Sequence, residues 1–208
     1  MGIKTMVQLN HHLMCAVDIE TTGTRPGWHE IIQIAFLPLN NKLEPHQDKQ
    51  VFECLIKPRY PERIADDLPY GMAGNVKKAQ LSGFDRDVAL DIFDLWYTNL
   101  KLPERKRIIP LAFCYQFDIA FLQEWMGHEN YAARIDSRTR DLQTVVQFLN
   151  DRADWHGQEY PFQKERLTLN EVCKLAGVPL DDIRLHDAVY DAYITAQAYK
   201  KVCQELWI

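Results

Sequence analysis

The sequence predicts an α/β fold in which helices flank a mixed central sheet of about five strands. Three apolar, strand-like segments follow one another near the start of the chain, at residues 14–19, 31–39 and 51–56. Apolar side chains at helical spacing characterise much of the remainder, most clearly at residues 85–100 and 187–206. With 208 residues, 47% of them hydrophobic, the chain can bury one substantial core. We therefore expect residues 1–208 to form a single domain.

The first three strands are expected to form an antiparallel meander, because parallel neighbours need a long crossover connection. Residues 57–83 contain prolines and glycines in turn settings and show no sustained alternation, which predicts a long irregular segment. Residues 85–100 are predicted to form an amphipathic helix. Its apolar residues recur at every fourth position, at Val88, Ile92, Trp96 and Leu100.

A fourth strand is expected at residues 108–114. Pro110 inside this strand indicates a bulge or a sheet edge, because proline has no N–H to offer the ladder. The helix that contains Asp118 is expected to end near Met126. Three further helices are predicted, at residues 141–149, 168–176 and 187–206.

Cysteine usage and the lack of long apolar stretches bear on location. Five cysteines, at positions 15, 54, 114, 173 and 203, form no Cys-x-x-Cys pair and lie mostly in apolar runs. This pattern predicts reduced, buried thiols in a cytoplasmic protein, and it argues against disulfides or a zinc site. No apolar stretch reaches membrane-spanning length, and residues 1–12 lack the apolar core of a signal peptide, so no membrane association is expected. His11 and His12 are interpreted as a surface pair, since two ligands alone seldom make a metal site.

Two carboxylates occur where a buried strand would not normally carry them. Asp18 and Glu20 lie at the end of an apolar strand, and residues i and i+2 of a strand point to the same face. Side by side, the two charges repel each other and raise one another's pKa unless a cation lies between them. Hard divalent metals bind such oxygen-rich sites. A bare Asp-x-Glu more often simply faces solvent, so the remaining acidic motifs decide between these interpretations.

Two further acidic segments complete a pattern. The first, residues 113–122 (FCYQFDIAFL), places Asp118 between the fourth strand and an apolar helix. The second, residues 185–192 (LHDAVYDA), places His186 five positions before Asp191 at the start of the last helix. Each motif alone is a weak signal, whereas the three motifs in this order are specific.

In this order the motifs resemble the DEDDh branch of the DEDD exonuclease superfamily, and the resemblance extends over most of the chain. That branch includes proofreading subunits of replicative polymerases, RNase T and oligoribonucleases. The resemblance implies an RNase H-like fold and 3′→5′ exonuclease activity. It implies that Asp18, Glu20, Asp118 and Asp191 hold two Mg²⁺ or Mn²⁺ ions. It also implies that His186 is the general base that deprotonates the attacking water.

The position of His186 distinguishes two branches of the superfamily. The related DEDDy branch carries a tyrosine four residues before the last aspartate, and Asp187 occupies that position here. Asp187 is expected to cap the last helix, where a carboxylate accepts hydrogen bonds from free backbone N–H groups. Phe113 and Cys114 stand where many members carry His-Asn, and Thr24 replaces an apolar residue that packs on the terminal base. These departures affect substrate detail and leave the metal ligands unchanged.

An exonuclease of this kind holds a terminal nucleotide without reading base sequence. The candidate contacts are Thr21, Thr22, Gly23, Trp28 and Trp155. Gly23 allows the backbone to approach the nucleotide closely, and an aromatic ring stacks on any base at ~1–3 kcal/mol. Ordinary packing explains both tryptophans equally well. The first motif reads Ile-Glu-Thr-Thr-Gly and not the Met-Glu-Met-Thr-Gly common in oligoribonucleases, which favours DNA over RNA.

The net charge of −5 predicts modest intrinsic affinity for nucleic acid, because proteins that bind phosphate backbones are usually basic. Bound metal would offset the four acidic ligands. Basic residues cluster at residues 101–107 and at Arg134, Arg138 and Arg140. Each cluster either contacts substrate or is solvated surface. A short strand end is therefore a better candidate ligand than a long duplex.

The leading hypothesis is a metal-dependent 3′→5′ exonuclease that acts on single-stranded DNA ends in proofreading or trimming. An exoribonuclease that trims RNA ends is the alternative. A metal-free binding module of the same fold is a third reading, against which the presence of all four carboxylates and the histidine argues. Nucleic acid 3′ ends are the expected partners, with a polymerase or other replication protein and a second copy of the chain left open.

Overall fold

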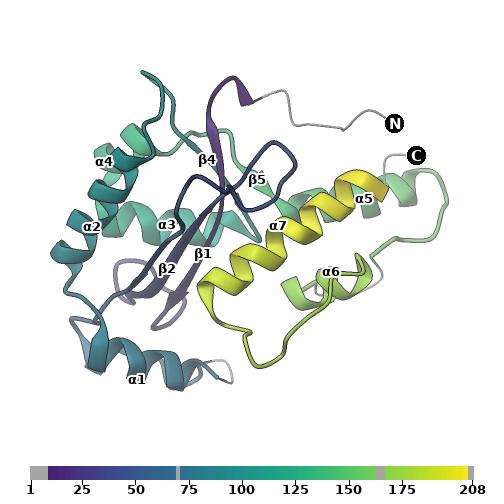
Figure 1. Ribbon diagram of the computed structural model, residues 1–208. Helices are drawn as coiled ribbons and strands as arrows, with labels where there is room; N and C mark the ends of the chain where they lie inside the picture. The colour runs from purple at the N-terminus through teal and green to yellow at the C-terminus, as the bar shows by residue number, and fades with distance from the viewer. Residues whose placement is uncertain (1–8, 69–70, 163–166, 206–208) are drawn as a thin grey trace.

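The computed structural model describes residues 9–68, 71–162 and 167–205, in which helices cover both faces of one sheet (Figure 1). The strands are β1 (Leu13–Thr21), β2 (Ile31–Pro38), β3 (Phe52–Leu55), β4 (Ile108–Ala112) and β5 (Arg140–Asp141). Their order across the sheet is β3-β2-β1-β4-β5. The first three strands pair antiparallel, whereas β4 runs parallel to β1 and β5 runs parallel to β4. The mixed five-stranded sheet and its antiparallel meander are thus confirmed.

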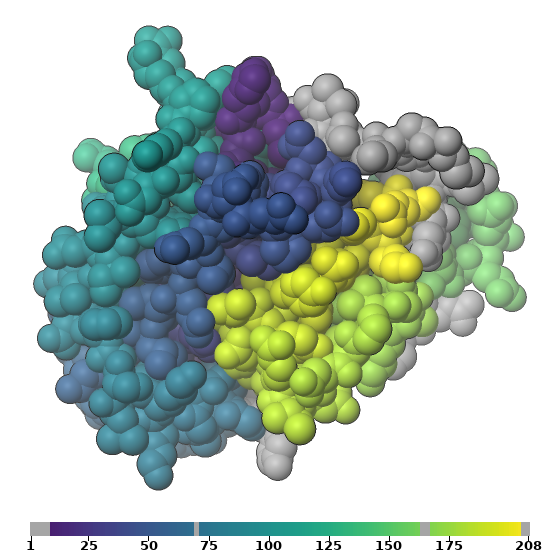
Figure 2. Space-filling model, viewed as in Figure 1, coloured from purple at the N-terminus to yellow at the C-terminus, as the bar shows by residue number. Residues whose placement is uncertain are grey.

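The helices divide between the two faces of the sheet. They are α1 (Met72–Ser82), α2 (Arg86–Asn99), α3 (Tyr115–Met126), α4 (His128–Arg134), α5 (Leu142–Trp155), α6 (Leu169–Leu175) and α7 (Ala188–Glu205). Helices α2, α3 and α4 share one hydrophobic core with the sheet, and α5, α6 and α7 share another. On the face shown in Figure 2, α7 in yellow lies beside α6 in light green. None of the helices in the described residues is long and apolar enough to cross a membrane.

Strand β1 alternates between the two cores. Its residues Cys15, Val17 and Ile19 belong to the core under α2 and α3, and Met14 and Ala16 belong to the core under α7. Because side chains alternate along a strand, Asp18 and Glu20 extend the second series and project toward α7. The predicted pairing of these two carboxylates on one face follows from this alternation.

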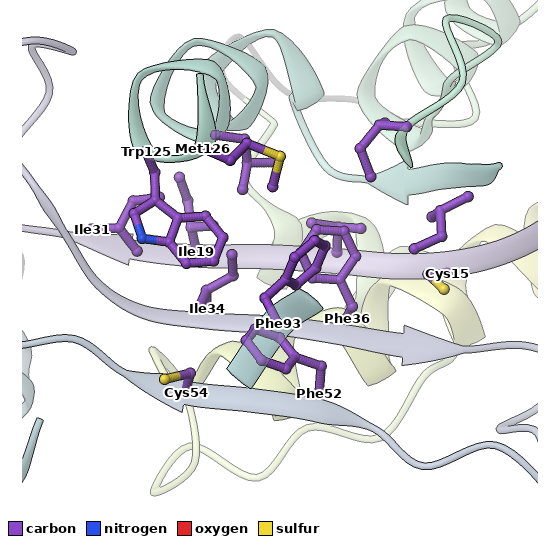
Figure 3. Packing of buried hydrophobic residues seen from close by; sticks show 14 of the residues in the cluster. Cys15, Ile19, Ile31, Ile34, Phe36, Phe52, Cys54, Phe93, Trp125 and Met126 are labelled. Atoms are coloured by element: carbon purple, nitrogen blue, oxygen red, sulfur yellow. The ribbon is translucent and has the colours of Figure 1, made fainter. Parts of the chain in front are cut away.

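Aromatic packing fixes α2 and α3 against the sheet (Figure 3). The ring of Phe93 in α2 lies 5.3 Å from that of Phe36 and 5.2 Å from that of Phe52, centroid to centroid. Trp125 of α3 meets Phe93 edge-on at 5.7 Å. Each such pair contributes about 0.5–1.5 kcal/mol beyond its buried area. This core therefore holds α3, which carries Asp118, at a fixed position on β1.

The expectation that residues 57–83 are irregular is wrong. They contain a 3₁₀ turn, η2 (Pro61–Arg63), and the helix α1, which packs against β2 and β3. Only Met72, Val76 and Ala79 of α1 are buried. This buried stripe of three side chains is narrow, and the glycines beside and within the helix make a helix hard to recognise from the sequence. The short helix α4 and the two-residue strand β5 were not expected either.

Pro110 occupies the side of β4 that faces away from β1. The Ile108 carbonyl accepts a hydrogen bond of 2.7 Å from the Asp136 N–H on that side. Pro110 follows Ile108 by two residues, so its missing N–H points the same way. Strand β5 pairs with β4 only from Leu111 onward. The proline therefore removes no bond between β4 and β1, but the expected sheet edge is wrong, because β4 lies inside the sheet between β1 and β5.

Candidate active site

Four carboxylates from three separated segments meet near the C-terminal ends of the parallel neighbours β1 and β4. Asp18 and Glu20 lie on β1, Asp118 lies in the first turn of α3 just after β4, and Asp191 lies in the first turn of α7. After burial, the charges of Glu20, Asp191 and Asp118 hold the pKa of Asp18 well above its usual range. Such mutual repulsion requires that the four groups lie close together.

The start of α3 is fixed by a carboxylate that the sequence analysis did not assign to the site. Asp141, the N-cap of α5, accepts hydrogen bonds from the backbone N–H groups of Cys114 at 3.2 Å and Tyr115 at 2.9 Å. It also caps its own helix by accepting from the Thr144 N–H at 3.2 Å. Cys114 adopts a left-handed conformation with φ of 61°, which turns the chain from β4 into α3. Asp141 thereby positions Asp118.

Asp187 caps the start of α7, as expected from the sequence. Its carboxylate accepts a hydrogen bond of 3.0 Å from the N–H of Tyr190. The N–H of Ala188 donates to Gln33 Oε1 of β2 at 3.4 Å, which ties the helix start to the sheet. Together these bonds set the rotation of α7, and that rotation directs Asp191 toward β1.

His186 lies immediately before this cap and beside the carboxylates. Its Nδ1 is 3.9 Å from Glu20 Oε1, and its backbone N–H donates to Asp191 Oδ2 at 3.2 Å. The residue has a positive φ of 64°, and its carbonyl accepts a hydrogen bond from the side-chain amide of Asn75 in α1. Burial lowers the pKa of the imidazole below its ordinary value. The ring is therefore neutral near pH 7, with 39% of the side chain exposed.

Among the described residues, no lysine or arginine forms an ion pair with any of the four carboxylates. Burial, followed by the charges of Asp191 and Asp118, raises the pKa of Glu20 to about 8. Burial raises the pKa of Asp191 to about 7, although the hydrogen bond from the His186 N–H acts in the opposite direction. Burial also raises the pKa of Asp118, against hydrogen bonds from backbone N–H groups.

A divalent cation fits this arrangement. Asp191 Oδ1 is buried and has no hydrogen-bond partner among the described residues, which is unusual for a carboxylate oxygen. One ligand atom each from Glu20, His186 and Asp191 lies within 4.8 Å of the others. Oxygen ligands of this kind suit Mg²⁺ and Mn²⁺. The site residues therefore match the chemistry of a hard metal ion.

No protein-family model matches the chain, and no curated protein sequence matches it significantly. Its fold is nevertheless shared with solved nucleases. The nuclease domain of 3′hExo, a DEDDh family member bound to rAMP, gives a TM-score of 0.62 at 14% identity, over 94% of this chain and 93% of that one. The chain has the fold of a DEDDh exonuclease.

Two other structures with this fold are longer than the chain. Cell-death related nuclease 4 gives a TM-score of 0.64 at 18% identity, over 92% of this chain and 63% of that one. E. coli ExoI in a metal-free complex with single-stranded DNA gives 0.61 at 18% identity, over 93% and 40%. The chain thus spans less than two thirds of either structure, so the similarity concerns the DEDDh fold alone.

Three of the predicted substrate contacts lie next to the carboxylates of β1. Thr21 and Thr22 directly follow Glu20, and the Thr21 hydroxyl donates to the Gly23 carbonyl at 2.7 Å. Thr22 bonds to Glu30 twice, through its N–H and its hydroxyl, each at 2.9 Å. Gly23 has φ of 155°, and an added Cβ would collide with the His29 ring. Only glycine therefore fits at this turn.

The two predicted tryptophan contacts lie elsewhere. Trp28 packs on the guanidinium of Arg63, 4.4 Å from its ring centroid, in a pocket that none of the four carboxylates lines. Trp155 is the last residue of α5, and 87% of it is exposed. Helix α5 begins beside α3 at Asp141 and is about 20 Å long, so Trp155 lies far from that end. The structure does not bring Trp155 to the carboxylates.

The first predicted basic cluster lies away from the carboxylates, and two members of the second are paired with acidic side chains. Residues 101–107 precede β4, whereas Asp118 follows its other end. Arg134 pairs with Asp94 at 2.9 Å, and Arg138 pairs with Asp136 at 2.8 Å. Arg134 and Arg138, two of the three arginines of the second cluster, are thus engaged within the protein, which favours the surface interpretation for them.

Proposed function

We propose that this protein is a metal-dependent 3′→5′ exonuclease that hydrolyses phosphodiester bonds at single-stranded ends. The observation that carries the proposal is the convergence of Asp18, Glu20, Asp118 and Asp191, with His186 beside Glu20. Asp191 Oδ1 has no partner of its own among the described residues, which supports a metal-holding role. Fold similarity alone would not assign this activity, because one fold hosts many functions.

The four carboxylates would hold two Mg²⁺ or Mn²⁺ ions, which when bound supply an activated water and neutralise charge on the attacking and leaving oxygens. The chain itself supplies the proton acceptor. Because Nδ1 of His186 faces Glu20, Nε2 is the atom that accepts the proton of the attacking water. A lowered imidazole pKa keeps this nitrogen free at neutral pH.

The turn at residues 21–23 is suited to a strand end. Thr21 and Thr22 direct side-chain oxygens into hydrogen bonds within the turn, so the backbone beside Glu20 is held rigid. Gly23 lets this turn pack directly against the His29 ring, because a Cβ at this position would collide with that ring. A rigid wall next to the metal ligands favours one productive position for the last nucleotide.

DNA is the proposed substrate, on the basis of the Ile-Glu-Thr-Thr-Gly motif at residues 19–23. RNA is the alternative, because similar folds bind both polymers: the ExoI complex contains single-stranded DNA, and another neighbour is a 3′-exonuclease recognising a histone mRNA stem-loop. The choice depends on contacts to the 2′-OH. A cytoplasmic location and a polymerase partner or homodimer remain predictions of the sequence.

Digestion of 5′-labelled single-stranded DNA and RNA oligonucleotides, side by side with Mg²⁺ or Mn²⁺, tests the proposal. We expect stepwise shortening from the 3′ end, faster on DNA, that stops when chelator is added. The Asp118→Asn variant provides the matched control, since it keeps the fold and removes one ligand. Faster shortening of RNA would select the alternative substrate. If the folded protein shortens neither polymer with either metal, the nuclease proposal fails, and the remaining hypothesis is a binding module of the same fold.

A further inference from the structure

A pocket lies on the α2 and α3 side of the sheet, and one of its lining residues, Ile31, pairs with Thr21, which directly follows Glu20. Its volume is about 230 Å³. Its walls are residues 27–31 after the Gly23 turn, residues 56–63 around η2, the start of α2 and the last turn of α3. Ile31 and Trp125, which lie together in Figure 3, form part of its floor. The four proposed metal ligands and His186 are not among the residues that line it.

The pocket is basic, although the whole chain is acidic. Four cations, Lys57, Arg59, Arg63 and Arg86, line it together with the two carboxylates of Glu30 and Glu124. Arg86 has a structural role, since its guanidinium donates to the carbonyls of Glu124 at 2.6 Å and Trp125 at 2.7 Å. The Glu30 carboxylate is also engaged, because it accepts a hydrogen bond of 2.9 Å from the Tyr60 N–H.

Among the described residues, the remaining three cations have at most one long ion pair. Lys57 and Arg59 are exposed, and no carboxylate among the described residues forms an ion pair with either of them. For Arg63 the nearest carboxylate oxygen among the described residues belongs to Glu62, at 4.0 Å. These three charges are therefore available to an external anion.

Two aromatic rings hold Arg63 in place. Its guanidinium lies 3.9 Å from the ring centroid of Tyr60 and 4.4 Å from that of Trp28. A guanidinium stacked on rings keeps its N–H donors in its own plane, where they match the oxygens of a phosphate. Trp28 is 49% exposed and Tyr60 is 37% exposed, so each retains ring surface for a base. The pocket thus combines a fixed phosphate donor with stacking surfaces.

We propose that this pocket is a subsite for a nucleotide of the substrate strand, upstream of the nucleotide held at the carboxylates. Its phosphate would bind Arg63 with Lys57 and Arg59, and its base would stack on Trp28. The inference rests on the proposed function only for the identity of the strand. A volume below the ~300–1,000 Å³ typical of small-molecule sites favours part of a chain over a whole free ligand.

The position along α3 agrees with such a subsite. Asp118 belongs to the active site, and Glu124 in the same helix lines the pocket. Six residues of α-helix separate them by about 9 Å along the axis. One strand can therefore have its 3′ end at the carboxylates and an earlier nucleotide in the pocket.

Length-dependent binding and turnover test the subsite. Single-stranded DNAs of increasing length, starting from a dinucleotide, are compared on wild type, Arg63→Ala and Lys174→Ala. Lys174 is exposed on α6, on the opposite face of the sheet, so its variant controls for the loss of one charge. For longer strands we expect Arg63→Ala to raise Kd and KM by about 10-fold with kcat unchanged. The dinucleotide should be unaffected, and so should Lys174→Ala.

Three outcomes overturn the proposal. The first is equal binding of long strands by wild type and Arg63→Ala. The second is equal weakening by Lys174→Ala, which would indicate diffuse charge. The third is binding of free dAMP to the pocket as tightly as a long strand binds, since dAMP would then be an independent ligand. Kd is measured by fluorescence anisotropy in chelator, without turnover, so loss of strand binding in Arg63→Ala supports the subsite even if no hydrolysis is found. Arg63→Lys keeps the charge and lacks the planar guanidinium. If this variant folds and still binds long strands weakly, the loss is due to the missing guanidinium and not to a folding defect.

Discussion

Asp191 has one carboxylate oxygen bonded to the His186 N–H and a second, buried oxygen with no partner among the described residues. Asp191→Asn should therefore lower turnover by several orders of magnitude, because a neutral amide is a poor ligand for a hard cation. In chelator the same variant should be as stable as wild type or more stable, since one repelling charge is removed. Single-turnover rates and thermal melts with and without Mg²⁺ check both expectations. A variant that loses stability in chelator while it keeps turnover would contradict this role.

His186 and Asp187 are adjacent residues with different expected roles. As general base, His186 should contribute about 10²–10⁴-fold to turnover, so His186→Ala should lose that much with metal affinity nearly unchanged. Because burial lowers the imidazole pKa, the wild-type rate should rise with pH through a pKa below the usual ~6.5 and then level off. Asp187→Ala should instead lose about 1 kcal/mol of stability, through the lost cap, and keep its chemistry. A His186→Ala enzyme with the wild-type pH profile would rule the base assignment out.

The raised carboxylate pKa values make the stability of the metal-free protein depend on pH. Folded Glu20 and Asp191 retain protons up to about pH 8 and about pH 7, whereas unfolded carboxyls lose them near ~4. The folded state binds more protons within that window, so the free energy of unfolding should fall as pH rises through it. Melting temperatures in chelator, measured from about pH 5 to about pH 8, should decrease, and Asp191→Asn should reduce the slope. A rise over the same window would show that the carboxylates are not coupled in this way.

Residues whose role depends on local spacing could be found from the sequence, and residues whose role depends on long-range contact could not. Asp18 and Glu20 follow from strand alternation, and Asp187 follows from its place before a helix. Asp141 could be placed near a helix start, but its bonds to the backbone of residues 114 and 115 arise only when β4 and α5 meet. Asn75 gives no signal at all, because its partner lies 111 residues further along the chain.

Helix α1 contacts the active site through one side chain. The Asn75 amide donates to the carbonyl of His186, a residue held at positive φ. A non-glycine residue in that conformation is strained, and the amide helps to hold it there. Asn75→Ala should lower kcat roughly 3- to 10-fold, the equivalent of one hydrogen bond, while KM changes little. Steady-state kinetics measure kcat and KM separately, and Lys77→Ala on the exposed side of α1 serves as the control.

That prediction has a clear contrary result. If α1 serves only to cover β2, Asn75→Ala should lower the melting temperature and leave kcat unchanged. Asn75→Asp adds a second comparison, because a carboxylate cannot donate to the carbonyl and should give at least the same loss. Wild-type kcat in both variants would remove Asn75 from the positioning of His186.

Strong periodicity made most elements predictable, and its absence explains those that were missed. The strands β1, β2 and β3 each carry enough apolar side chains to be recognised. The short helix α4 buries only Tyr131 along its length, and β5 has two residues, so neither has a pattern of its own. Both exist because neighbouring elements pack on them. Their prediction would have required the tertiary structure first.

At the scale of the whole molecule, the order of strands along the sequence was enough to predict part of the sheet. Three successive strands without crossovers predicted the meander, whereas the parallel pairing of β4 with β1 is known only from the structure. The net charge of −5 predicted weak general affinity, and the structure shows where local positive charge is nonetheless available, in the pocket around Arg63. The predicted clusters of lysine and arginine did not include that pocket, because Lys57, Arg59 and Arg63 are spaced between other residues and Arg86 joins them only in the folded chain.

Helix α7 packs across β1 and β2 and carries Asp191, about 170 residues after Asp18 in the chain. The proposed catalytic centre therefore cannot form in a nascent chain from which this helix has not yet emerged, however complete the sheet is. On the proposed function, the growing polypeptide would therefore remain inactive as a nuclease while it is still close to the mRNA that encodes it. For the same reason, any opening that separates α7 from β1 and β2 would take Asp191 away from the other three carboxylates.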